Sequence, residues 1–147
     1  MEHEDELIRS LETKADVIRR DILTILASSQ MGHAGGSMSL VEIVTALYFH
    51  HLKYDPKDPD HPERDRVVLS KAHCCEALYA ALVEIGWFPR ETLGTYYHFG
   101  SPFQGHADRW STPGIEYSGG SLGQGLSYAA GLALAEKLKT SKKPSAA

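Results

Sequence analysis

A chain of 147 residues, of which 42% are hydrophobic and 23% charged, is long enough for one globular unit with a modest core. Its net charge of −4 argues against a nucleic-acid-binding protein, and no run of about 18 apolar residues could span a membrane. The acidic start lacks the features of a secretory signal, and the only cysteines, Cys74 and Cys75, are adjacent. We therefore expect a cytoplasmic protein without structural disulfides.

The amino-terminal third predicts two helices separated by a loop. Apolar residues recur with helical period over residues 3–28, with charged residues between them. The next segment, SSQMGHAGGS, contains three glycines and is predicted to be a loop that presents His33. A second helix is expected after Ser39, with a capping box between Ser39 and Glu42.

The middle of the chain predicts a strand followed by a loop and a helix. Residues 55–65, rich in Pro and Asp, form a connection, and residues 66–69 are a short β-branched run typical of a parallel sheet. His73 follows this strand, and a helix is predicted over residues 74–85. Because α/β folds bind ligands at the carboxyl ends of such strands, His73 is a candidate site residue. A short helix is expected over residues 89–97.

Residues 104–125 hold six of the thirteen glycines and predict a loop that leads into a helix over residues 122–139. Glycines let the backbone approach a ligand closely, and the start of the helix offers unpaired N–H groups that suit an anion. The helix carries a stripe of leucines beside a stripe of small residues. We expect it to be buried on most sides, and its candidate neighbours include a second subunit. Residues 140–147 are expected to form a flexible tail.

Three of the eight histidines, His33, His73 and His106, share one setting: each follows a small residue in a predicted loop. Such histidines can hydrogen-bond a diphosphate or a substrate hydroxyl and can carry protons near neutral pH. The alternatives are solvated loop histidines or three ligands of a catalytic zinc, although their spacings match no local metal motif. Cys74 and Cys75 are interpreted as small buried residues rather than reactive thiols.

Three ordered segments resemble one known family: SSQMGHAGGSMSLVEIVTALYF, DRVVLSKAHCCEALYAAL and QGHADRWSTPGIEYSGGSLGQGLSYAAGLALA. From residue 15 to residue 139 the chain resembles the amino-terminal, thiamine diphosphate-binding domain of transketolase, and especially the amino-terminal subunit of split-gene transketolases. The resemblance implies an α/β fold, here mostly helical with one or two short strands, with residues 1–139 forming part of that domain. It also implies a cofactor bound between this domain and a pyrimidine-binding domain from another subunit.

The resemblance assigns roles to positions of this sequence. His33 resembles the histidine that contacts substrate hydroxyls and relays protons, and His73 the one that contacts the cofactor diphosphate. His106 resembles the histidine near the donor's C1 hydroxyl and the carbanion intermediate. The segment that packs on the cofactor corresponds to Gly120, Ser121 and Leu122.

The sequence also departs from the family pattern. Ala72 stands where the family usually has Gly, and Gly119 where it usually has Thr. The Gly-Asp-Gly acid and the later Asn that hold the family's divalent metal are missing, since the chain has no Gly-Asp pair and no Asn. We therefore assign no metal ligand here and expect Mg²⁺ to be held by another chain.

The resemblance thus implies part of an enzyme that moves a two-carbon ketol group between sugar phosphates, as in the pentose phosphate pathway. The complementary chain would supply the metal ligands and the activating glutamate, in a dimer or heterotetramer, and the isolated chain is expected to be inactive. The alternative is a noncatalytic assembly or regulatory module related to transketolase.

Overall fold

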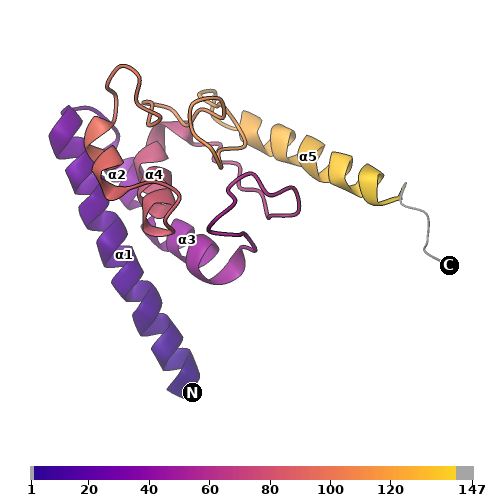
Figure 1. The fold of residues 1–147 in the computed structure, drawn as a ribbon, viewed down its shortest axis with the longest axis horizontal. Coiled ribbons are helices and arrows are strands. Elements are labelled where there is room, and N and C mark those ends of the chain that lie inside the picture. Colours follow the sequence, from indigo (N-terminus) through magenta and orange to yellow (C-terminus); the bar gives the residue numbers. More distant parts are fainter. Residues whose placement is uncertain (1, 142–147) are drawn as a thin grey trace.

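The computed structural model describes residues 2–141, which form a helical body from which the last helix projects (Figure 1). The helices are α1 (Glu2–Ser29), α2 (Ala34–Met38), α3 (Val41–Ala46), the π-helical η1 (Leu47–His51), the 3₁₀ turns η2 (Ala72–Cys74) and η3 (Arg90–Thr95), α4 (Cys75–Glu84) and α5 (Gln124–Ser141). The mostly helical prediction is confirmed, and α1, α4 and η3 begin and end close to the predicted positions.

Helix α4 lies at the centre of the core. Every residue from Cys75 to Val83 is buried. The helix is therefore enclosed around its whole circumference, which is the pattern of a helix surrounded by others. Helix α1 packs along it through the predicted apolar face, where Ile18, Ile22 and Ile25 are fully buried.

The predicted loop around His33 contains a helix that the sequence did not predict. Residues 34–38 form α2 although two of the five are glycines, which disfavour helix. The predicted capping box is wrong: Leu40 precedes α3 without a side-chain cap, and the Ser39 hydroxyl donates to the carbonyl oxygen of Gly36. Tertiary contacts, rather than local capping, therefore fix this segment.

The predicted strand over residues 66–69 is not a strand. Among residues 2–141 the structure contains only an isolated bridge between Asp55 and Asp58. Residues 66–69 run without a regular hydrogen-bonding pattern, because an extended segment becomes a strand only when another segment pairs with it. The fold expectation of one or two short strands is not met within this part of the chain.

Helix α5 is far less buried than predicted. One side rests on the body through Gly125, Tyr128, Ala129 and Leu132, while Leu126 is 77% exposed. In Figure 1 the helix runs away from the other helices, so its leucine stripe has little to pack against. The helix continues to Ser141, and residues 142–147 of the predicted tail lie outside the described residues.

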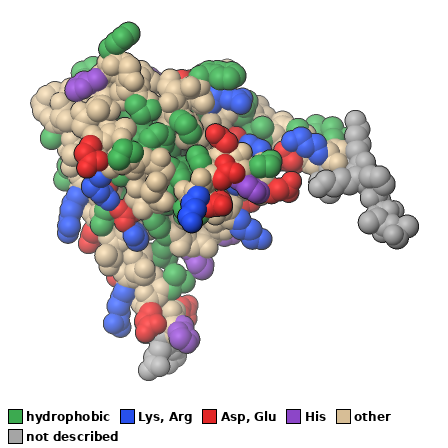
Figure 2. Space-filling model, viewed as in Figure 1, with side chains coloured by type: hydrophobic (Ala, Val, Ile, Leu, Met, Phe, Trp, Pro, Cys, Tyr) green, Lys and Arg blue, Asp and Glu red, His purple; other side chains and the backbone are tan. Residues whose placement is uncertain are grey.

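Charged side chains of both signs are mixed along the face that contains α1 (Figure 2).

No helix within residues 2–141 combines the length and the apolar character needed to cross a membrane.

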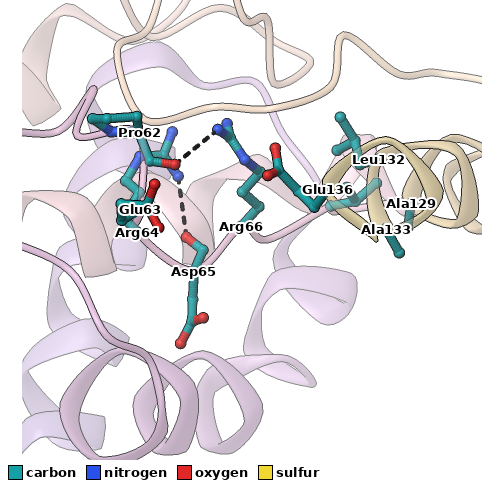
Figure 3. Close-up of a pocket in the computed structure, with 10 residues that line it drawn as sticks. Pro62, Glu63, Arg64, Asp65, Arg66, Ala129, Leu132, Ala133 and Glu136 are labelled. Carbon is teal, nitrogen blue, oxygen red and sulfur yellow. Dashed lines mark hydrogen bonds between the residues drawn. The ribbon is translucent and has the colours of Figure 1, made fainter. Parts of the chain in front are cut away.

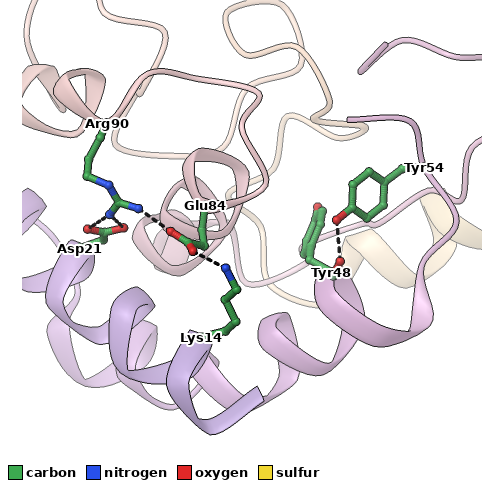
Figure 4. A network of polar contacts seen from close by, with 6 residues as sticks. All are labelled: Lys14, Asp21, Tyr48, Tyr54, Glu84 and Arg90. Carbon is green, nitrogen blue, oxygen red and sulfur yellow. Dashed lines mark hydrogen bonds and ion pairs between the residues drawn. The ribbon is translucent and has the colours of Figure 1, made fainter. Parts of the chain in front are cut away.

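A network of charged side chains joins α1, α4 and η3 (Figure 4). Arg90 forms ion pairs with Asp21 and Glu84, and Lys14 reaches Glu84 at 2.6 Å. Burial raises the pKa of Asp21, although Arg90 opposes the shift. Burial also acts to raise the pKa of Glu84, but hydrogen bonds from Lys14 and Arg90 outweigh it and the pKa is lowered. The network therefore depends on its cations.

We predict that Arg90→Met lowers the free energy of unfolding by about 1–3 kcal/mol at pH 7, because it leaves the buried Asp21 without its cation. The deficit should shrink as the pH falls toward 4, since protonation removes the unpaired charge on Asp21. The control is Arg19→Met, which breaks only exposed ion pairs to Asp16 and Glu42 and should cost about 0–1 kcal/mol. Urea unfolding at both pH values measures this; equal losses for the two variants would contradict it.

Candidate active site

The structure brings the three predicted histidines together. The rings of His33 and His73 meet edge to face with centroids 5.4 Å apart, and those of His73 and His106 are separated by 4.5 Å. Forty residues separate the first two in sequence and thirty-three the last two. The fold therefore assembles the cluster from three separate segments, and we call it the histidine cluster below.

His73 occupies the middle of the cluster because of its place beside α4. It lies in the 3₁₀ turn η2, which leads directly into that buried helix. Its Nδ1 atom is buried and has no hydrogen-bond partner among the described residues. Since buried polar atoms are normally paired, this nitrogen lacks a partner that the described residues could provide.

His106 is held through its backbone. The hydroxyl of Tyr79, on α4, donates to the carbonyl oxygen of Gln104 at 2.9 Å and lies 3.3 Å from that of His106. Burial lowers the pKa of His106, and the electrostatic influence of the neighbouring His73 and His33 lowers it further. The lowered pKa favours the neutral ring of His106, which can accept a proton at one nitrogen and donate a hydrogen bond from the other.

The start of α5 does not form the predicted general anion site. The hydroxyl oxygen of Ser70 accepts hydrogen bonds from the backbone N–H groups of Gly123, at 3.1 Å, and Gly125, at 3.2 Å. A side chain at Gly125 would run into the backbone of Ser70, so glycine is required for this approach. The first N–H groups of the helix thus tie α5 to residue 70 instead of facing a ligand.

Of the predicted cofactor-binding residues, Gly120 lies beside the histidine cluster. A Cβ atom at Gly120 would lie 3.7 Å from Cδ2 of His106. Ser121 and Leu122 follow on the exposed side of the loop. Gly120 therefore borders the cluster, and Leu122 lies open at the surface.

The two departures from the family pattern lie next to each other. A Cβ atom at Gly119 would come within 3.1 Å of the Cβ atom of Ala72 and would strike the ring of Tyr117. The methyl group of Ala72 therefore occupies space that a larger residue at position 119 would need. Glycine at position 119 thus leaves room for the methyl group of Ala72, although the ring of Tyr117 is the nearer obstacle to a side chain there.

Neither the zinc alternative nor reactive cysteines gain support. Within residues 2–141, no three His, Cys, Asp or Glu side chains are arranged to hold a metal ion. Cys74 and Cys75 are buried and free, and burial raises the pKa of the Cys75 thiol to about 12. The interpretation of both cysteines as buried structural residues is confirmed.

A pocket of about 290 Å³ lies away from the cluster, between residues 62–68 and one side of α5 (Figure 3). Arg64 and Arg66 both pair with the buried Glu116, the second at 3.0 Å. None of the predicted site residues lines this pocket. It marks the place where α5 rests on the unpaired extended segment.

Two residues that support the site were missed by sequence reasoning. Glu76 and Tyr79, both on α4, contact the segments that carry His33 and His106. Their only signal was the presence of polar groups in the largely apolar helix CEALYAALVE, and such a pattern also fits ordinary exposed positions.

The comparisons with known proteins agree with this geometry. Residues 11–145 match the family described as "Transketolase, thiamine diphosphate binding domain". The chain therefore belongs to the transketolase family and contains part of its thiamine diphosphate-binding domain.

The relatives include separate subunits as well as full-length enzymes. The chain is 48% identical over 128 residues to the 6-deoxy-6-sulfo-D-fructose transketolase subunit of Clostridium sp. (strain MSTE9), covering 87% of this chain and 46% of that one. It is 46% identical over 134 residues to an apulose-4-phosphate transketolase subunit of Actinobacillus succinogenes, covering 90% and 49%. Transketolase from Leishmania mexicana superposes with a TM-score of 0.81 at 37% identity, over 86% of this chain and 19% of that structure. The chain thus spans about half the length of the curated subunits that it matches.

The residues present fit the cofactor that the family binds. The unpaired Nδ1 atom of His73 can donate to or accept from a polar group, and Gly120 leaves open space beside His106. The nearby Lys71 already donates to the Gly36 carbonyl and the Ser39 hydroxyl. A diphosphate bound here would therefore need further positive charge from outside the described residues.

We predict that Gly119→Thr, which introduces the residue usual in the family, lowers the free energy of unfolding by about 1–3 kcal/mol through overpacking against Ala72. Adding Ala72→Gly should recover only part of that loss, because the contact with Ala72 is relieved while the closer contact with the Tyr117 ring remains. The control is Gly131→Thr, made in open space on α5. Thermal unfolding of these three variants and of Ala72→Gly alone tests this, and purely additive effects of the two substitutions would contradict the coupling.

Proposed function

We propose that this chain is the first part of a transketolase that moves a two-carbon ketol group between sugar phosphates. The observation that carries the proposal is the histidine cluster, in which three rings from separate segments come together and the central ring, His73, has a buried nitrogen without a hydrogen-bond partner. Membership in the family supports the same reaction class.

The two free cysteines fit a reducing compartment, so we propose that the reaction takes place in the cytoplasm.

The reaction has a simple balance. The bond between C2 and C3 of a ketose breaks, an aldose two carbons shorter leaves, and the same two carbons join the aldehyde carbon of an acceptor. The proton lost from the donor's C3 hydroxyl is matched by one gained on the acceptor's carbonyl oxygen. No net oxidation occurs, so the protein must position the sugars and manage protons.

Each histidine has a proposed task. His73 hydrogen-bonds the cofactor diphosphate through a ring nitrogen, while Gly120, Ser121 and Leu122 contact the cofactor. His33 and His106 hydrogen-bond the sugar hydroxyls, and the neutral form of His106 at pH 7 allows it to hold the transferred proton. Thiamine diphosphate supplies the carbon centre that accepts the ketol group.

The chain is proposed to work only with a complementary chain, in a dimer or heterotetramer. The curated relatives that it matches are about twice as long, and both are named as transketolase subunits. The missing parts would supply the ligands for Mg²⁺, the activating glutamate and the strands that pair with residues 66–69. The noncatalytic alternative has less support, because the relatives above are transketolases or their subunits.

We predict that the purified chain does not transfer ketol groups with thiamine diphosphate, Mg²⁺ and sugar phosphates, and that activity appears when the complementary chain from the same host is added. His106→Ala in the assembled enzyme should lower kcat about 100-fold, the scale of a lost acid–base group. His51→Ala, at an exposed histidine of η1, is the control and should keep full activity. A coupled aldose-release assay measures this, and turnover by the chain alone would contradict the dependence.

The exposed side of α5 is the proposed contact with the complementary chain. Leu126 and Leu134 lie on its uncovered stripe, and exposed apolar stripes of this kind mark protein interfaces. The fold of this chain leaves them open, while the matched subunits contain a further half that could cover them.

We predict that Leu134→Lys weakens co-purification of the two chains at least tenfold, because it places a charge in an apolar contact. Leu23→Lys on α1 is the matched control, since Leu23 is 56% exposed and Leu134 is 58% exposed. Both variants should keep the helical circular-dichroism signal. Equal co-purification of the two variants would contradict α5 as the contact.

A further inference from the structure

Glu76 is a fully buried acid that the proposed chemistry does not use. It lies in the first turn of α4 with no exposed surface, and no ion pair with Lys or Arg involves it among the described residues. Burial of a carboxyl group is costly unless hydrogen bonds compensate. Glu76 must therefore have partners that offset its burial.

Three donors surround the Glu76 carboxyl group. Its Oε1 atom accepts from the backbone N–H of His33 at 2.9 Å and from the Tyr96 hydroxyl at 3.1 Å. Its Oε2 atom accepts from the Ser37 hydroxyl at 2.5 Å. Two of the three donors thus belong to the short helix α2 and the residue that precedes it.

This arrangement resembles half of a capping box supplied by a different helix. In an ordinary capping box, an acid in the first turn accepts the backbone N–H of its own N-cap residue. Here the N-cap residue of α2 is His33, which makes no side-chain cap bond, and its N–H is bound by an acid of α4. The α2 start is therefore held by a contact 43 residues away in sequence.

The loop before His33 is built closely against the same carboxyl group. Gly32 has φ +128°, a conformation that side chains disfavour, and a Cβ atom there would overlap Oε1 of Glu76 and the side chain of Leu26. The backbone thus needs glycine at position 32 in order to bring the His33 peptide to Glu76.

We propose that Glu76 is a positioning residue, whose buried carboxyl group fixes the His33 peptide and thereby sets the separation of the His33 and His73 rings. His73 and Glu76 are three residues apart at the start of one buried helix. A single rigid turn therefore carries one histidine directly and holds the second through a hydrogen bond. The catalytic consequence rests on the proposed function, but the geometric claim does not.

The charge of Glu76 also acts on His106, where it partly offsets the lowering of the pKa by burial and by the other two histidines. The other titratable groups that face or adjoin Glu76 are His33, Cys74, Cys75 and Tyr96. Removal of the charge alone should therefore lower the pKa of His106 further. A purely packing role for Glu76 would leave that pKa unchanged.

Two variants separate the hydrogen bond from the shape and the charge. Glu76→Met keeps the length of the side chain but removes the acceptor, whereas Glu76→Gln keeps an acceptor oxygen and removes the charge. Hydrogen exchange of the His33 amide, followed by NMR on the full chain, should accelerate at least tenfold in E76M and stay within threefold of the parent in E76Q. The contact between the His33 and His73 ring protons should be lost only in E76M.

The control is Tyr54→Phe, which removes the core hydrogen bond from the Tyr54 hydroxyl to the carbonyl oxygen of Tyr48. It should leave His33 exchange within twofold of the parent. The histidine titration of E76Q should show a lower midpoint for His106. Parent-like His33 exchange in E76M, or acceleration in Y54F as large as in E76M, would overturn the proposal.

If E76M does not fold, Glu76→Asp tests the positioning role instead. The Asp side chain keeps the carboxylate but is one methylene shorter, so its oxygens lie farther from the His33 N–H. A threefold or greater acceleration at His33 supports positioning, and parent-like exchange overturns it. These measurements need no cofactor, partner or activity. The two claims can therefore fail separately. If E76M accelerates His33 exchange but the assembled enzyme transfers no ketol groups, the proposed function is refuted and the positioning role stands.

Discussion

The complete burial of α4 is the constraint on which the rest of the structure depends. From Cys75 to Val83 the helix has no exposed side, so α1, α2, α3 and η3 must all pack around it. Two side chains in its first turns bind the loops around it. Glu76 accepts a hydrogen bond from the His33 N–H, and the Tyr79 hydroxyl donates to the carbonyl oxygen of His106. One enclosed helix thus orients all three parts of the histidine cluster.

The local sequence pattern predicted helices with a periodic apolar face and loops marked by glycines. Helices α1 and α4 and the three histidine loops follow from period, glycine content and the ends of apolar runs. Helix α2 could not be predicted, because AGGSM is a poor helix former that depends on contacts with α4. Residues 66–69 have strand composition, but a strand also requires a pairing segment, and none is present among the described residues.

The closeness of the three histidines was expected from the sequence, but the residues that support them were not. Convergence of His33, His73 and His106 follows from their shared setting, and the rings do meet. Glu76 escaped notice because an acid in a helix is usually a solvated position, and only its neighbours show otherwise. Ala72 and Gly119 were separate departures in the sequence, yet a side chain at position 119 would meet the methyl group of Ala72.

The central claim is that the histidine cluster is the cofactor-contacting wall of a shared active site. Its most direct test is a titration of thiamine diphosphate into the assembled two-chain enzyme, with Mg²⁺ present, while the histidine ring signals are followed by NMR. The account predicts that His33, His73 and His106 shift together with one midpoint, while the exposed His50 and His51 remain unchanged. Saturable cofactor binding that leaves the signals of all three cluster histidines in place would contradict it.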